Sequence, residues 1–278
     1  MPSCARQVAI RVIHRVVSQQ AYAGPSLDAE LVRARLDARD ARLATQIVYG
    51  TLRLLPDIDA LLQPLLRRGW PEDFTSSALR AAAYQIVYLE RVPPFATVER
   101  SVEIVKSQRG KGLSGLTNAV LRKVVAHRSE QPREPDSQSV PAWVRESLQG
   151  GLGAARTETM LRVSAQTPPL CLRVSPGADA DALTEQLRGL GERVSVESSS
   201  LVEGSLHVRG AGDPRSWAAH GEGVFAVQDE GAQMLGQLLG ARPGERVLDA
   251  CAGHGGKTAQ IACAVGPSGS VTAVDIHE

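Results

Sequence analysis

The residues most suited to chemistry gather near the C-terminal end of the sequence, between Arg246 and Asp275. The first half of this stretch reads Arg246-Val-Leu-Asp-Ala-Cys-Ala-Gly-His-Gly-Gly-Lys-Thr258. Its glycines form a loop whose backbone can come close to a ligand, because no Cβ stands in the way. Asp275 follows about 20 residues after the glycines, where an acid can accept hydrogen bonds from ribose hydroxyls. The stretch therefore predicts a site for a nucleoside-containing cofactor.

The elements that position these residues follow from the local pattern. Arg246–Leu248 is short, apolar and β-branched, which is typical of a buried parallel strand that ends at Asp249. Lys257–Val265 is compatible with a helix, so the glycine loop lies at a helix N-terminus. Ser270–Val274 predicts a second strand, with Asp275 at its tip. We expect the cofactor at the carboxyl ends of two neighbouring parallel strands.

Three ligands compete for this loop. A dinucleotide site has the pattern G-x-G-x-x-G/A, but Gly253-His-Gly-Gly-Lys-Thr258 ends in threonine. A phosphate-binding Walker loop ends in Gly-Lys-Thr, as here, but Cys251 occupies the place of its first glycine. S-adenosylmethionine has no pyrophosphate, so it needs only a close backbone and an acid for its ribose. A tight turn that binds no ligand is the structural alternative.

The loop resembles the first motif of the RNA 5-methylcytosine methyltransferases, whose usual form is D-x-C-A-A-P-G-G-K-T. The chain departs from this form at Gly253-His254, where the family has Ala-Pro, and we expect a more flexible loop without the proline. The resemblance implies S-adenosyl-L-methionine as the cofactor. The cofactor-binding residues that we predict are Cys251, Ala252, Gly253, His254, Gly255, Gly256, Lys257 and Asp275.

The same family methylates C5 of cytosine by covalent catalysis, in which a thiolate adds to C6 and makes C5 nucleophilic. In this family the nucleophilic cysteine follows a threonine and a second cysteine follows a proline. The chain contains neither a Thr-Cys nor a Pro-Cys dipeptide, and its cysteines are Cys4, Cys171, Cys251 and Cys263. We therefore assign no catalytic residue. We expect the C-terminal part of the chain to be the opening of a truncated catalytic domain, and the chain to be inactive by itself.

Composition limits the class of protein. The chain of 278 residues is long enough for two or three domains. It has no apolar run of about 18 residues that could span a membrane, and no secretory signal pattern. Its four cysteines lack the C-x-x-C spacing of a zinc site. The sequence thus predicts a cytoplasmic protein with reduced thiols, without a metal and monomeric.

Charge is unevenly distributed along the chain. Residues 1–130 carry 19 Lys and Arg against 12 Asp and Glu, whereas the remainder carries 12 against 18. A basic first half joined to an acidic second half indicates that the first half binds a polyanion. A solvated arginine-rich surface is the alternative.

Residues 1–128 predict an all-α bundle. Apolar residues recur at three- and four-residue steps from Ala5 to Val17, and Arg6, Arg11 and Arg15 lie off this stripe, toward solvent or a ligand. Gly24-Pro25 is expected to break the chain. The further helices that we predict cover 26–36, 38–55, 57–66, a helix from Ser76 or Ser77 to about residue 89, 97–108 and 113–127.

This half is similar to the NusB fold, a helical RNA-binding bundle that is also attached to one bacterial methyltransferase subfamily. The stretches that carry the similarity are Tyr49–Arg53, Tyr84–Tyr88, Arg91–Pro93, Ser101–Val105 and Asn118–Arg122. The similarity implies RNA, here 16S ribosomal RNA, as the partner. Tyr49 and Tyr84 could equally be core rings, and Asn118 a helix cap.

The rest of the chain divides into three parts. Residues 129–141 are polar, contain three prolines and predict a linker. Residues 142–235 predict a small α+β module with strands at Leu170–Val174, Arg193–Val196, Ser205–Val208 and Val224–Val227. This module resembles the segment that precedes the catalytic domain in the same methyltransferases. Residues 236–278 begin a Rossmann-like domain.

Three functional hypotheses follow from these patterns. The first is a methyltransferase that acts on C5 of a cytosine in 16S ribosomal RNA and belongs to the subfamily of the RsmB/NOP family that carries a NusB-like domain. The second is a non-catalytic RNA-binding protein of the antitermination type with a vestigial methyltransferase segment. The third is a nucleotide-dependent enzyme that uses Gly256-Lys257-Thr258 on a phosphate.

Overall fold

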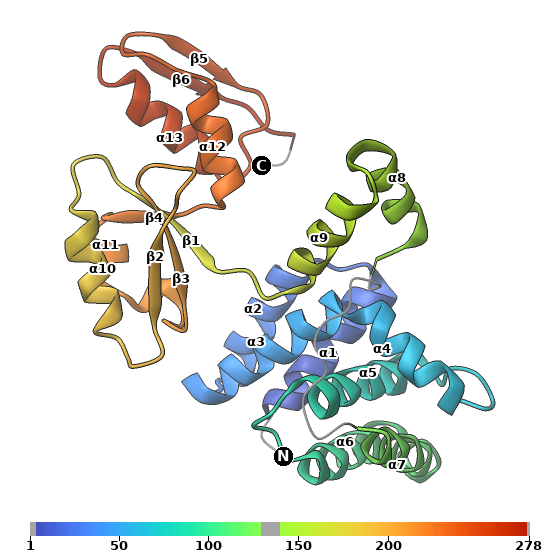
Figure 1. The fold of residues 1–278 in the computed structure, drawn as a ribbon. Helices are drawn as coiled ribbons and strands as arrows, with labels where there is room; N and C mark the ends of the chain where they lie inside the picture. Colours follow the sequence, from blue (N-terminus) through green and yellow to red (C-terminus); the bar gives the residue numbers. More distant parts are fainter. Residues whose placement is uncertain (1–3, 129–139, 277–278) are drawn as a thin grey trace. The chain divides into compact units, whose positions relative to one another are not determined.

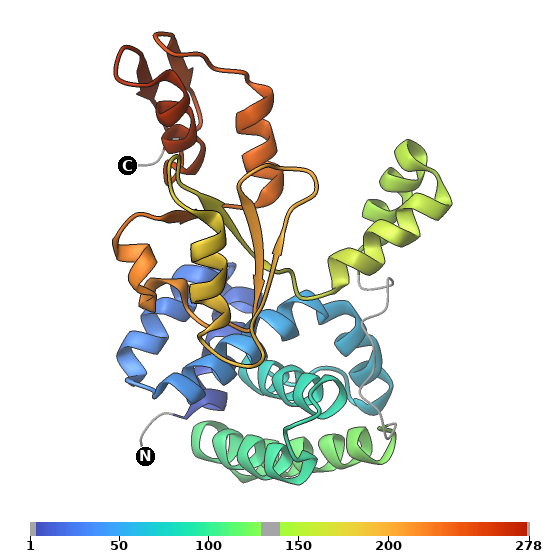
Figure 2. The ribbon, with the colours of Figure 1, turned by 60° about the vertical axis from the view of Figure 1, so that its left-hand side comes forward.

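The computed structural model describes residues 4–128 and 140–276. The chain divides into two compact units, residues 1–167 and 168–278, which are described separately (Figures 1 and 2). The linker that the sequence predicts over 129–141 lies almost entirely outside the described residues. The two helices that follow it, α8 and α9, belong to the first unit.

The first unit is helical throughout its described residues. Its main bundle, coloured from blue to light green in Figure 1, is followed by the hairpin of α8 and α9. The elements are α1 (Ala5–Gln19), α2 (Ala23–Ala34), α3 (Ala38–Arg53), α4 (Leu55–Leu62), the 3₁₀ turn η1 (Gln63–Leu65), α5 (Asp73–Tyr88), α6 (Pro94–Arg109), α7 (Lys111–Ala126), α8 (Ala142–Leu152) and α9 (Ala154–Ala165).

Three predicted helix starts, those of α2, α5 and α6, were wrong by three residues or more. The helix α6 begins at Pro94 and not at Thr97, because proline fits the first position of a helix. The helix α2 begins at Ala23, because Gly24 and Pro25 fit its first turn, where the missing N–H of proline is not needed. The helix α5 begins at Asp73, because Glu72 caps it by accepting the N–H groups of Phe74 and Thr75.

The serines that we expected to start α5 lie inside it, where both are buried. Their hydroxyls donate to backbone carbonyls of the preceding turn. Ser76 Oγ bonds Pro71 O at 2.9 Å, and Ser77 Oγ bonds Asp73 O at 2.7 Å. Such bonds allow a polar side chain to be buried in a helix, so serine did not mark the helix start here.

A close contact between α3 and α5 shapes the bundle core. A Cβ added to Gly50 would lie 2.0 Å from the Tyr84 ring, so only glycine allows this approach. Tyr84 is buried and stacks on Tyr88 with ring centroids 5.8 Å apart. Tyr84 is therefore a core ring, whereas Tyr49 is 41% exposed.

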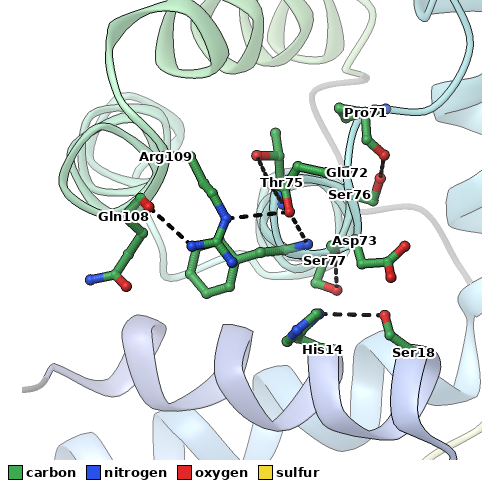
Figure 3. A network of polar contacts seen from close by, with 11 residues as sticks. His14, Ser18, Pro71, Glu72, Asp73, Thr75, Ser76, Ser77, Gln108 and Arg109 are labelled. Carbon is green, nitrogen blue, oxygen red and sulfur yellow. Dashed lines mark hydrogen bonds and ion pairs between the residues drawn. The ribbon is translucent and has the colours of Figure 1, made fainter.

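A polar network joins the start of α5 to the end of α6 (Figure 3). Arg109 lies 3.3 Å from the Glu72 carboxylate and places its guanidinium 4.6 Å from the centre of the Phe74 ring. Burial alone would raise the pKa of Glu72. Hydrogen bonds from Thr75 and from the N–H of Phe74 outweigh burial, and the pKa of Glu72 is lowered.

The second unit begins with an antiparallel sheet in the order β2-β3-β1-β4. With its helices it follows the β-α-β-β-α-β order of a ferredoxin-like module. The elements are β1 (Leu170–Val174), α10 (Ala180–Arg188), β2 (Ser195–Ser198), β3 (Ser205–Arg209), the 3₁₀ turn η2 (Pro214–Ser216), α11 (Ala218–Gly221) and β4 (Phe225–Val227).

The predicted position of the second strand was wrong by two residues. The N–H of Val194 bonds the carbonyl of Gly191, so residues 191–194 form a turn. The strand starts at Ser195 and pairs Val196 with Val208, which places both valines in the core of the module. Turn geometry and cross-strand pairing, which alternation alone does not contain, decided this boundary.

The remaining elements carry the glycine loop. They are α12 (Glu230–Leu238), β5 (Arg246–Asp249), α13 (Gly256–Val265) and β6 (Ser270–Ala273). The strands β5 and β6 pair in parallel, as predicted, and α13 packs on them and on α12 (Figure 1). Ile261 and Val265 of α13 are buried, while Leu248 and Val274 remain 64% and 51% exposed.

Candidate cofactor site

The glycine loop runs from the end of β5 into the first turn of α13. Gly253 has φ 51° and Gly255 has φ 81°, the left-handed region that glycine favours. No side chain caps α13, because its N-cap residue is Gly255. The N-terminal end of the helix, with the partial positive charge that its first N–H groups carry, therefore borders the loop.

Asp249 holds the two ends of the loop together. Its Oδ2 accepts a hydrogen bond of 2.6 Å from the Thr258 hydroxyl, and its Oδ1 accepts one of 3.3 Å from the N–H of Cys251. Asp249 and Thr258 are not among the site residues predicted from the sequence. Their positions at the strand end and in the first helical turn were the signal that could have identified them.

Asp275 joins the loop to the end of β6. Its Oδ2 accepts a hydrogen bond of 2.7 Å from the N–H of Gly253, and the N–H of Ala252 bonds Val274 O at 3.0 Å. The acid therefore lies beside the glycines, as the spacing predicts. One of its oxygens also fixes the loop, a role that the sequence did not indicate.

The structure brings all the predicted site residues together. Five of them, Cys251 to Gly255, form the loop, while Gly256 and Lys257 open α13. Most are solvent-exposed, including His254 and Lys257, and Ala252 and Gly255 are half-buried. A ligand here would meet bare backbone, the helix N-terminus with Lys257, and the carboxylate of Asp275. This combination suits a ligand that carries both a ribose and a carboxylate.

The cysteines are dispersed and unpaired. Cys251 lies exposed in the loop and Cys263 exposed on α13, while Cys4 and Cys171 are half-buried. Burial raises the pKa of the Cys171 thiol, which disfavours its nucleophilic thiolate form. Within residues 4–128 and 140–276, no group of His, Cys, Asp or Glu side chains has the arrangement of a metal site.

The arginines of α1 differ in their surroundings. Arg6, which we expected to face solvent or a ligand, turns into the bundle and donates to Gln85 Oε1 at 2.8 Å. Burial lowers the pKa of this guanidinium. Arg11 lies 3.6 Å from the buried Glu30 carboxylate. These two arginines therefore have packing roles, which a sequence stripe cannot reveal.

In the described part of the chain, no helix is long and apolar enough to cross a membrane.

Comparison with known proteins finds a family for the first half of the chain and relatives that match almost all of it. Residues 3–126 match the model of the NusB family. The chain is 30% identical over 284 residues to the "Probable ribosomal RNA small subunit methyltransferase B" of Bacillus subtilis, covering 98% of this chain and 63% of that protein. It is 29% identical over 280 residues to the "Ribosomal RNA small subunit methyltransferase B" of Pseudomonas putida, with 98% and 63% covered.

A solved structure shares the fold over nearly the full length. The crystal structure of PH0851 superimposes with a TM-score of 0.72 at 22% identity, covering 99% of this chain and 63% of that one. The chain spans less than two thirds of the length of the relatives named above.

Proposed function

We propose that the chain belongs to the family of ribosomal RNA small subunit methyltransferase B proteins, to which it is similar over nearly its whole length, and that it takes part in S-adenosyl-L-methionine-dependent methylation of 16S ribosomal RNA. In this proposal the glycine loop binds the cofactor and the N-terminal bundle binds RNA. The segment β5–α13–β6 opens a Rossmann-like methyltransferase domain. The observation that carries the proposal is the meeting of Gly253, the uncapped start of α13 and Asp275.

The loop suits S-adenosylmethionine better than a dinucleotide. It lies at a helix N-terminus, where N–H groups and Lys257 can bind the amino-acid carboxylate of the cofactor. The carboxylate of Asp275, at the end of β6 and beside the glycines, can accept hydrogen bonds from the ribose hydroxyls. When bound, the cofactor supplies an electrophilic methyl group. The residues of this chain bind and orient it.

We further propose C5 of cytosine as the methylated atom, on the resemblance of the loop motif. This chemistry needs a thiolate that attacks C6. None of the four cysteines follows a threonine or a proline. We therefore assign no catalytic cysteine within residues 1–278, and we assign cofactor and RNA binding to this chain.

Cofactor binding can be measured by titration calorimetry on the chain as it is. The Asp275→Ala variant loses a charge-assisted hydrogen bond to the ribose, on the order of 1.5–3 kcal/mol, which raises the Kd roughly 10- to 150-fold. Asp275→Asn keeps an oxygen that can accept from Gly253 and thus isolates the contribution of charge. Glu203→Ala, an exposed acid in a turn of the module, is the control. Equal Kd values in all four proteins would exclude Asp275 from the site.

RNA binding is tested by fluorescence anisotropy with fragments of 16S ribosomal RNA. The basic balance of residues 1–130 predicts contacts to phosphates, which release counterions. The affinity should therefore fall at least about tenfold between 50 and 200 mM salt. An affinity that does not change with salt would show that the arginines form only a solvated surface.

A further inference from the structure

Four polar side chains link the antiparallel sheet to the cofactor helix. Arg173 of β1 donates from Nε to Gln228 Oε1 at 2.7 Å, and Gln228 donates from Nε2 to Gln260 Oε1 at 3.0 Å. Gln260, on α13, donates from Nε2 to the backbone carbonyl of Gln233 at 2.9 Å. Gln233 in turn donates to the backbone carbonyl of Gln228, also at 2.9 Å. We call this set, Arg173, Gln228, Gln233 and Gln260, the amide relay.

The relay can be oriented in one direction only. Arginine is always a donor, so Gln228 must turn its oxygen toward Arg173 and its amino group toward Gln260. Gln260 must then accept with its oxygen, which leaves its amino group for the carbonyl of Gln233, an acceptor only. The guanidinium at one end and the carbonyl at the other thus fix the orientation of both amides between them.

Because two of these amides are buried, breaking their hydrogen bonds should cost more free energy than at the surface. Gln228 is 7% exposed and Gln233 is 1% exposed, and a buried amide that loses its partner pays the full desolvation penalty. Bonds in such surroundings are also stronger than in water. The relay should therefore hold one arrangement of α13 against the sheet.

The helix α12 leaves room for the relay at one position. A Cβ added to Gly236 would lie 2.2 Å from Gln260 Oε1. Gly236 is half-buried in the last turn of α12, and glycine inside a helix is unfavourable by up to about 1 kcal/mol relative to alanine. A glycine here lets the Gln260 amide lie against α12.

Gln260 is well placed to influence the loop. It lies on α13 less than one turn after Lys257 and Thr258, next to the buried Ile261. The Asp249–Thr258 and Gly253–Asp275 bonds hold the loop to β5 and β6. The relay instead holds the first turns of α13 to the module, which is a different body of secondary structure.

We propose that Gln260 is a positioning residue for the cofactor loop, and that Arg173 sets its orientation through Gln228. The module is then a support that keeps the N-terminus of α13 directed at the ligand, in addition to any contact of its own with RNA. The part of this inference that concerns cofactor affinity rests on the proposed function. The part that concerns loop order does not.

The test combines hydrogen exchange of the ligand-free chain with calorimetry of S-adenosylmethionine. In Gln260→Met, which keeps the shape but removes both bonds, backbone exchange over 251–259 should speed up about tenfold and the Kd should rise about fivefold to tenfold. Gln237→Met, the same change at an exposed position of α12, should leave both values unchanged. Gly236→Ala displaces the Gln260 amide without removing it and should give a smaller change in the same direction.

A double-mutant cycle separates a relay from independent packing effects. If Arg173 acts through Gln260, the double variant Arg173→Met with Gln260→Met should resemble Gln260→Met alone. The proposal would be overturned if the effects of Arg173→Met and Gln260→Met added in the double variant. It would also be overturned if exchange over 251–259 in Gln260→Met stayed within twofold of the wild-type rate. If exchange over 251–259 speeds up in Gln260→Met but the wild type does not bind S-adenosylmethionine, the positioning role of Gln260 is supported and the proposed cofactor is rejected.

Discussion

In the N-terminal bundle the side chains that hold the helices together are fully buried, as for Ile47 and Leu121. In the β5–α13–β6 segment, Ile261 and Val265 cover one face of the strands, while Leu248, on β5, is mostly exposed. The loop of this segment owes its conformation to hydrogen bonds of Asp249 and Asp275. Apolar packing therefore determines stability in the first region, and a few polar contacts determine geometry in the second.

The largest expected difference between the two regions is the loss of stability when a large side chain is truncated to alanine. Ile47→Ala, at a fully buried position of α3, should destabilise the bundle by about 2–5 kcal/mol, because it removes apolar contacts and leaves a void. Leu248→Ala, at a position that is 64% exposed, should change stability by less than about 0.5 kcal/mol. Urea unfolding followed by circular dichroism measures both. Comparable losses would show that β5–β6 is packed as tightly as the bundle.

The second effect tests the close approach of α3 and α5. Gly50→Ala places a methyl group against the Tyr84 ring and should destabilise the bundle by about 1–3 kcal/mol through overpacking. Gly115→Ala, in α7 where a Cβ meets no atom within 4 Å, should instead stabilise by about 0.5–1 kcal/mol through helix propensity. Thermal unfolding gives both signs. A stabilising Gly50→Ala would refute the described packing.

A smaller effect is expected at the loop itself. Thr258→Val removes the bond to Asp249 and should make the loop easier to open by about 1 kcal/mol without changing the stability of the bundle. Hydrogen exchange over 251–259 should speed up, while exchange in α3 and α5 stays at the wild-type rate. Faster exchange in both regions would mean that the two regions are not independent.

The smallest effect concerns pH. The folded pKa of Glu72 lies below its ordinary value of 4.5, so the charged carboxylate stabilises the bundle above that pH. This contribution should be lost as the pH falls from about 4.5 through the lower folded value. When the free energy of unfolding of the bundle is measured against pH, its decrease below about pH 4.5 should therefore be smaller in Glu72→Gln than in the wild type. Glu99→Gln, at an exposed position of α6, should not change this decrease. The same loss of stability at low pH in Glu72→Gln as in the wild type would contradict a stabilising cap by the Glu72 carboxylate.

The same comparison explains what could be predicted from the sequence. Helices of the bundle were predictable where burial follows a three- to four-residue period, as in α1 from Ala5. Their starts at Ala23 and Asp73 were not, because a proline in a first turn and a glutamate cap outweighed the usual signals. The buried serines of α5 gave a false helix start because their hydroxyls bond backbone carbonyls inside the helix and do not cap it.

The loop was predictable by another route. Its residues are consecutive, so a motif and one spacing located Gly253, the start of α13 and Asp275 together. The bond between Arg6 and Gln85 and the amide relay were not predictable. Their partners lie 79, 55, 32 and 27 residues apart, and only the tertiary fold brings them together.

The most direct test of the central claim is hydrogen exchange of the chain with S-adenosylmethionine, with a 16S ribosomal RNA fragment, and with neither. We expect the cofactor to protect the loop over 251–258 and the residues around Asp275, and RNA to protect helices of the bundle. Cofactor protection in the bundle, or no protection of the loop at saturating cofactor, would contradict the division of roles between the two regions.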